Sequence, residues 1–201
     1  MEKNNKKKIV IILLVILFIV LVTIGTIYFI NRNNILKQEF LEQEKIQNTI
    51  VSTLTIDVNP SIEINLNKNT LVVSVKGLND DSVKLLDNHN FKGQKLDDVL
   101  DNLVKLLKDN NYLESETNTI LVNITTTDKN MESIVKDDFE KVTKNNNVNT
   151  EIIILSAPET EELKKIASEN NITIGKAYYI EEQIKDQEEL TIEDFKDVSI
   201  N

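Results

Sequence analysis

The chain has 201 residues, 40% hydrophobic and 28% charged, a composition typical of a chain that folds mainly as one globular domain. Its 33 acidic and 23 basic residues give a net charge of −10, which argues against a nucleic-acid-binding surface. The absence of cysteine excludes disulfides and thiol catalysis, the single histidine argues against a secreted Ser-His hydrolase, and four glycines are too few for a glycine-rich phosphate loop.

An uncharged apolar run occupies residues 9–30. As a helix it would span about 33 Å, close to the hydrocarbon thickness of a bilayer. A cleavable signal peptide is the rival interpretation, but its apolar core is shorter, at about 7–15 residues. We therefore predict one uncleaved transmembrane helix at the N-terminus.

Four lysines lie in residues 1–8, directly before the apolar run. The positive-inside rule then predicts a short cytoplasmic tail, a single-pass anchor in the cell membrane and an extracellular C-terminal domain. Residues 31–49 are polar and contain neither Pro nor Gly. We expect them to extend the helix as a juxtamembrane stalk.

The outer domain is expected to cover residues 50–186 and to begin with three strands. Alternating β-branched segments occupy residues 51–58, 61–67 and 70–76, separated by Asn59-Pro60 and by Lys68-Asn69. In the first of them Leu54, Ile56 and Val58 share one face, and Thr53, Thr55 and Asp57 share the other. Short turns between such segments favour an antiparallel meander.

Helices and strands alternate in the rest of the domain. Helical spacing of apolar residues predicts helices over 94–110, 128–144 and 158–170 and from Gly175 onward, and a last helix within the tail 187–201. Residues 80–87 are expected to form a short turn or helix, and the apolar segments 118–126 and 150–156 are expected to be strands. Strands followed by alternating helices indicate an α/β (α+β) sandwich. Acidic pairs such as Asp137-Asp138 lack calcium-loop spacing and are expected to be solvated helix caps, so we expect no metal and no cofactor.

One dipeptide, Asn59-Pro60, has unusual chemistry. An Asn side-chain nitrogen can attack its own main-chain carbonyl, forming a succinimide and breaking the bond to the next residue. The competing route uses the N–H of the next residue, which proline lacks. Thr55 and Asp57 lie on the Asn59 side of the strand, and Ser61 and Glu63 follow, so any of them could orient the amide or accept its proton. The plain interpretation is a structural turn, because Asn-Pro is a frequent turn signal.

The surroundings of this dipeptide resemble the extracellular, membrane-proximal domain of RsgI-type anti-sigma factors. The matching stretch is VSTLTIDVNPSIEINLNKNTLVVSVKGLNDDSVKLL, with the family's DxNPSIE corner and LNxxxxVVxVxxLNxD pattern. The later segment ENNITIGKAYYIEEQI is similar to the end of that domain, so the resemblance runs from Thr53 to near Lys185.

The resemblance implies that the domain cuts itself between Asn59 and Pro60, with Asp57, Ser61 and Glu63 in motif positions around the cut. It also implies that the fragments stay associated until an intramembrane protease releases the cytoplasmic part. Full-length members place a sigma-binding domain before the span, whereas eight residues precede it here. We therefore expect one of three situations: a truncated paralogue, a half encoded beside a separate cytoplasmic protein that connects it to a sigma-factor system, or the product of a mis-called start codon. If the domain cleaves itself, we expect at most a single-turnover reaction. The alternative is a non-catalytic, membrane-tethered interaction or sensor domain with Asn59-Pro60 as a structural turn.

Overall fold

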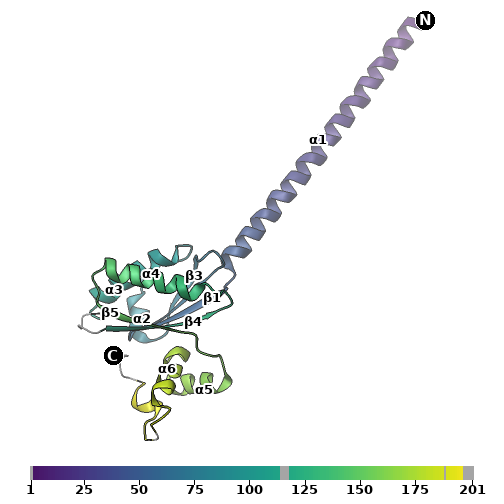
Figure 1. The fold of residues 1–201 in the computed structure, drawn as a ribbon. Coiled ribbons are helices and arrows are strands. Elements are labelled where there is room, and N and C mark those ends of the chain that lie inside the picture. Colours follow the sequence, from purple (N-terminus) through teal and green to yellow (C-terminus); the bar gives the residue numbers. More distant parts are fainter. Residues whose placement is uncertain (1, 114–117, 188, 197–201) are drawn as a thin grey trace. The chain divides into compact units, whose positions relative to one another are not determined.

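The computed structural model describes residues 2–113, 118–187 and 189–196, and it divides the chain into two compact units that meet between Lys45 and Ile46. The first unit consists of most of helix α1, Glu2–Asn48 (Figure 1). This helix confirms that the apolar run and the polar stretch after it are helical. Leu13, Leu14 and the apolar side chains from Ile16 to Ile30 are exposed, and the stretch Ile16–Asn48 is long and apolar enough to cross a membrane. The helix therefore fits a membrane anchor.

The second unit is built on a five-stranded sheet. Its strands are β1 Ser52–Asp57, β2 Ser61–Leu66, β3 Val72–Gly77, β4 Asn118–Thr126 and β5 Thr150–Leu155. The strand order is β3-β2-β1-β4-β5, with β4 and β5 parallel and every other neighbouring pair antiparallel. The predicted meander of the first three strands is confirmed. The sheet places β1 at its centre, hydrogen-bonded to β2 on one side and to β4 on the other.

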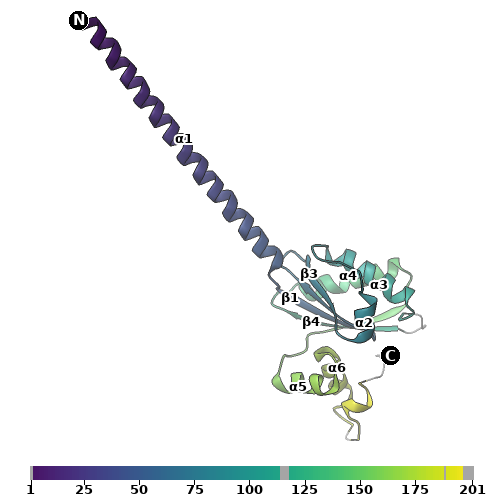
Figure 2. The same cartoon turned by 180° about the vertical axis from the view of Figure 1, so that it is seen from behind.

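Helices cover both faces of this sheet. They are α2 Asp80–Leu85, α3 Leu96–Asp109, α4 Met131–Asn145, α5 Glu161–Asn170 and α6 Ile174–Ile184. Figure 1 shows α3 and α4 on one face and α5 and α6 on the other, and Figure 2 shows the same layers from behind. The predicted α+β sandwich is confirmed.

The face under α3 and α4 carries the main hydrophobic core. Fully buried strand residues such as Leu54, Ile64 and Val122 pack there against helix residues such as Leu103 and Phe139. Alternation along each strand sends these residues to one face, as the sequence pattern requires.

The opposite face carries a smaller apolar cluster under α5 and α6. It contains Ala157, Leu163, Ala167 and Ala177, with partly buried neighbours such as Leu155. Polar side chains of β1, β2 and β4 share this face, and three of them, Asp57, Asn65 and Asn123, are buried. The second helical layer therefore packs on a surface that is partly polar.

Three local expectations differ from the structure. Helix α5 begins at Glu161 and not at Pro158, because the Thr160 hydroxyl accepts from the Leu163 N–H and caps the helix there. The expected last helix is a single 3₁₀ turn, Ile192–Asp194, and residues 197–201 lie outside the described chain. Asp137 and Asp138 lie within α4 and are not helix caps.

Candidate functional site

The Asn-Pro dipeptide forms the turn between β1 and β2. Asp57 and Ser61 are the last paired residues, so Val58, Asn59 and Pro60 make the loop, and the Val58 N–H donates to the Pro60 carbonyl over 2.9 Å. Asn59 is exposed and Pro60 is buried, and no peptide bond between described residues is cis. The scissile bond that the sequence suggests therefore lies at the tip of a tight hairpin between two inner strands.

Asn59 adopts a left-handed backbone conformation, with a φ of 58°. Asparagine tolerates this region better than most residues. Four other described asparagines do the same: Asn88, Asn111, Asn147 and Asn171. Backbone conformation alone does not set Asn59 apart in this chain, whereas the proline that follows it does.

Asp57 is a buried carboxyl group at the base of the turn. Its exposed fraction is 2%. The Ser61 hydroxyl donates to Oδ1 over 2.5 Å, and the Thr173 hydroxyl donates to Oδ2 over 2.6 Å. One partner comes from the same hairpin, and the other comes from the start of α6, 116 residues later in the chain.

Burial raises the pKa of the Asp57 carboxyl above its usual range. Desolvation is the largest effect, because removal from water disfavours the charged form. The hydrogen bonds from Ser61 and Thr173 and the charge of Lys176 act in the opposite direction and lower the pKa. The balance leaves a carboxyl that takes up a proton more readily than an exposed aspartate does.

The N-terminus of α6 holds the second partner of Asp57. Thr173 is the N-cap residue of that helix, and its Oγ1 accepts from the Lys176 N–H over 3.0 Å. The Lys176 side chain is buried, and its ammonium group donates to the Lys196 carbonyl over 2.7 Å. This hydrogen bond connects the segment after α6 to the first turn of α6.

Asn79 connects the other side of the hairpin to α2. Its Oδ1 accepts from the Ser61 N–H over 3.3 Å and from the Ser82 N–H over 3.0 Å. Asn79 is the N-cap residue of α2 and forms a capping box with Ser82. The backbone directly after Pro60 is therefore anchored to a helix cap.

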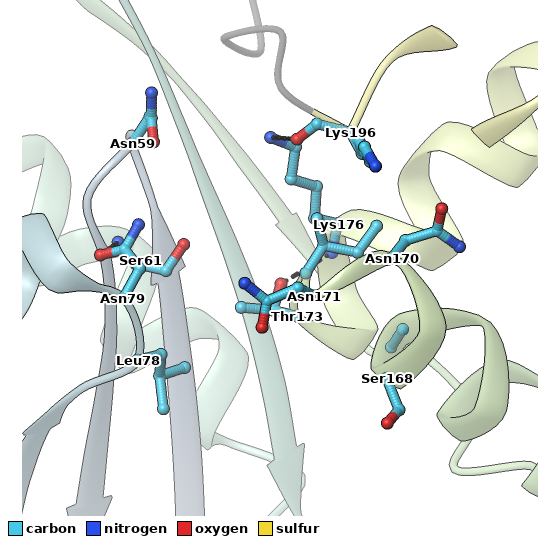
Figure 3. Close-up of a pocket in the computed structure, with 12 residues that line it drawn as sticks. Asn59, Ser61, Leu78, Asn79, Ser168, Asn170, Asn171, Thr173, Lys176 and Lys196 are labelled. Carbon is cyan, nitrogen blue, oxygen red and sulfur yellow. Dashed lines mark hydrogen bonds between the residues drawn. The ribbon is translucent and has the colours of Figure 1, made fainter. Parts of the chain in front are cut away.

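A polar pocket of about 710 Å³ opens beside the turn. It is lined by Asn59, Ser61 and Asn79 on the hairpin side and by residues of α5, α6 and the loop between them, including Asn171 and Lys176. Figure 3 shows the Asn59 side chain at the tip, with its amide nitrogen directed away from Ser61 and Asn79. The pocket leaves room for this side chain to rotate.

Of the other residues suggested by the sequence, neither joins this hydrogen-bonded group. Glu63 lies further along β2 and accepts from the Asn65 Nδ2 over 2.8 Å. Thr55 pairs with Glu63 across the strands, and its buried Oγ1 has no hydrogen-bond partner among the described residues. The structure therefore groups Asp57 and Ser61 with the turn and leaves Thr55 and Glu63 beside it.

The sequence patterns do not predict two residues of the site, Thr173 and Asn79. Each is a Ser/Thr/Asn-type residue directly before a helix, a signal that predicts an N-cap. Neither signal indicates a contact with a hairpin 18 or more residues away, such as the Ser61–Asn79 bond. Within the described parts of the chain, no group of three His, Asp or Glu side chains converges as a metal ion would require.

The hydrogen-bonded Asp57–Ser61 pair has the functional groups that proton transfer requires, and it lies beside the Asn59–Pro60 peptide bond. Asn59 supplies an amide nitrogen close in the covalent structure to its own carbonyl carbon. Ser61 and Asp57 form a hydroxyl–carboxyl pair directly below the turn. A carboxyl with a raised pKa is suited to accept a proton and pass it on.

Comparison with known proteins gives a family match over the same region. Residues 51–182 match the model of the anti-sigma factor RsgI-like central domain. The chain is 28% identical over 144 residues to the anti-sigma-I factor RsgI4 of Acetivibrio thermocellus and 28% identical over 156 residues to RsgI7 of the same organism. These alignments cover 69% and 75% of this chain, but the chain spans only 28% of the length of each relative.

Proposed function

The chain belongs to the RsgI-type anti-sigma factor family, and on that premise we propose that its second unit cleaves itself once, between Asn59 and Pro60, and keeps both fragments together as a signalling element at the membrane. Membership in the family supports a signalling or regulatory role for a membrane-anchored domain. The observation that carries the cleavage proposal is the Asn59-Pro60 bond above the buried Asp57–Ser61 pair.

The reaction balances without water or a cofactor. The Asn59 Nδ2 attacks the Asn59 carbonyl carbon, a new C–N bond closes a succinimide ring, and the bond to the Pro60 nitrogen breaks. Nδ2 loses one proton and the Pro60 nitrogen gains one. The products are residues 1–59 ending in a succinimide and residues 60–201 beginning with a secondary amine. Proline favours this route because it has no N–H for the competing attack on the side chain.

Asp57 is the group we propose as proton acceptor. Its ionised carboxylate would draw the proton from the Asn59 amide through the Ser61 hydroxyl, which already donates to Oδ1. For this step the amide must rotate toward Ser61, and the open pocket beside the turn supplies the space. The proton can then return along the same path to the departing Pro60 nitrogen.

The position of β1 supports continued association after cleavage. The cut leaves β1 on the membrane-linked fragment, while β2 and β4 belong to the other fragment. β1 pairs with both along its whole length, Ser52–Asp57. Burying its two core side chains, Leu54 and Ile56, contributes about 3–6 kcal/mol in addition to the backbone hydrogen bonds.

In this proposal the membrane anchor has its N-terminus in the cytoplasm and the cleaved domain outside. The lysines before the apolar run support that orientation. Withdrawal of β1 would free the anchor for an intramembrane protease, and a sigma-factor system would receive the signal through a cytoplasmic partner. The orientation is tested with a tag at each end of the chain, by measuring which tag an added protease can reach in the membrane fraction of the cells.

The direct test of cleavage uses the full chain purified in detergent. The wild type should give two bands on a denaturing gel, and the larger fragment should begin at Pro60 on N-terminal sequencing. Asn59→Ala should give one band, because the nucleophile is gone. The smaller fragment should be lighter by one water than a hydrolytic product of the same length.

Asn147→Ala is the matched control for this test. Asn147 is also exposed and left-handed, with a φ of 52°, but it is not followed by proline and does not line the pocket. This variant should cleave like the wild type. A wild-type chain that stays whole contradicts self-cleavage and favours the alternative of a non-catalytic interaction or sensor domain, in which Asn59 is one more left-handed turn residue.

The pH dependence of cleavage gives a second prediction. Since the ionised form of Asp57 accepts the proton, the rate should rise with pH through a pKa above the usual 3.8 of an aspartate. Asp57→Asn should lower the rate by about 10²-fold or more at neutral pH. The measurement is the cleaved fraction against time after cell-free synthesis at a series of pH values. Asp109→Asn, at an exposed position, is the control.

The same substitution has a predicted effect on stability. A folded-state pKa raised above the unfolded value means that the contribution of Asp57 to stability is full below the unfolded pKa and is lost as pH rises through the folded pKa. Asp57→Asn should therefore flatten the pH dependence of the free energy of unfolding above the usual aspartate range.

A cleavage rate unchanged by Asp57→Asn would remove Asp57 from the mechanism.

A further inference from the structure

We infer that Thr173 is a positioning residue for this cleavage, and that the reacting group is complete only after α6 has packed on the sheet. The inference rests on the proposed self-cleavage and extends it to regulation by the C-terminal segment of the same chain. Its basis is the hydrogen bond between the Thr173 hydroxyl and the Asp57 carboxylate, which joins residues 116 positions apart.

The two oxygens of Asp57 are held in different ways. Oδ1 is held by Ser61, four residues away in the same hairpin, so this contact forms as soon as the hairpin forms. Oδ2 is held by Thr173 over 2.6 Å. With both oxygens bound to hydroxyl donors, the plane of the carboxylate is set below the turn. Loss of the Thr173 contact would leave it free to rotate about one remaining bond.

Thr173 is itself placed by the packing of α6. Its hydroxyl oxygen accepts from the Lys176 N–H, so the side chain is oriented by the helix it caps. Gly175 brings that helix directly against β4: a Cβ placed on Gly175 would lie 2.4 Å from the Asn123 Cβ. Asn123 in turn accepts from the Ala157 N–H over 2.8 Å, at the exit of β5. The position of the hydroxyl therefore reports that the second layer has formed.

The order of the chain gives this dependence a use. The turn and β1 are synthesised early, whereas Thr173 is synthesised more than a hundred residues later. Cleavage before the sheet is complete would separate the anchor from the domain, because β1 would lack its β4 neighbour. Dependence on Thr173 delays cleavage until β1 is held on both sides.

The experiment compares Thr173→Val and Thr173→Ser in the full chain, by following the cleaved fraction with time and pH. Valine keeps the shape but removes the donor, so cleavage should slow by about 10-fold or more, the scale of one hydrogen bond to a charged group. The pH profile of the cleavage rate should shift to higher pH, because the lost donor no longer lowers the pKa of Asp57. Serine keeps the donor and should restore both the rate and the profile.

Thr160→Val is the matched control, because Thr160 caps α5 through the Leu163 N–H, whereas the hydroxyl groups that donate to Asp57 belong to Ser61 and Thr173. It should weaken a helix cap by a similar amount and leave the rate and pH profile of cleavage unchanged. Equal slowing by Thr160→Val and Thr173→Val, or a wild-type rate in Thr173→Val, would overturn the positioning role.

A titration in the uncleavable Asn59→Ala chain separates this inference from the proposed function. There the Asp57 carboxyl, followed by NMR, should titrate at higher pH when Thr173→Val is added. An unchanged titration would overturn the inference even if the wild type cleaves. A wild-type chain that stays whole would overturn the proposed function instead, and the titration would still show whether Thr173 controls Asp57.

Discussion

Replacing Leu54 by alanine is expected to loosen the two cleavage fragments from each other by about 2–5 kcal/mol, the usual loss for truncating a fully buried leucine. Leu54 is 0% exposed and lies in the middle of β1. Among the described strands, β1 is the only one that belongs to the membrane-linked fragment after the cut. Truncation leaves a cavity in the main core while both backbone ladders remain. The fragments should therefore still associate but separate more easily.

The measurement immobilises the detergent-solubilised chain through a C-terminal tag and follows release of residues 1–59 in increasing urea. Release should need clearly less urea in Leu54→Ala than in the wild type. Ile50→Ala is the matched control: Ile50 lies on the same fragment, just before β1, and is 49% exposed. Release at the same urea concentration in both variants would contradict the central, buried position of β1.

Replacing Gly175 by alanine is expected to destabilise the second helical layer, although alanine favours helices over glycine by about 0.5–1 kcal/mol. The added Cβ would meet the Asn123 Cβ at 2.4 Å, a distance that requires α6 or β4 to move. Overpacking of this kind costs about 1–3 kcal/mol. Movement of α6 would also draw Thr173 away from Asp57, so cleavage should slow in the same variant.

Thermal unfolding and the cleavage time course together test this prediction. Gln183→Ala is the control, because it adds an alanine to the same helix at an exposed position. That variant should keep the wild-type melting temperature and rate. Gly175→Ala with a higher melting temperature and a normal rate would show that α6 does not pack closely on β4.

Local elements of this domain could be predicted because their signals depend on neighbouring residues. The period of apolar residues in α3 and the alternation in β1 and β2 indicate which side of each element is buried, whatever lies opposite. The same holds for the long apolar helix, which needs only its composition and length. Helix ends depend also on side-chain caps: Pro158 is typical of a helix start, but the Thr160 cap places the start of α5 at Glu161.

The candidate site could be predicted only in part. The dipeptide Asn59-Pro60 and the neighbours Asp57 and Ser61 are close in sequence, and the short turn keeps them close in space. The same closeness in sequence predicts that Glu63 joins them, but its side chain accepts a hydrogen bond from Asn65. Alternation puts a residue on a face; it does not choose which polar neighbour on that face becomes its partner.

By itself, the sequence determined an apolar N-terminal helix, a hairpin with the reactive dipeptide at its tip, and a set of amphipathic helices, all of which follow from local periodicity. Only the tertiary structure decided that β1 lies at the centre of the sheet and that Thr173 reaches the Asp57 carboxylate. Both depend on where β4 and α6 return after long connections. A strand has the same alternation at the edge and in the centre of a sheet, and a helix cap has the same residues whether or not a buried carboxyl lies in front of it.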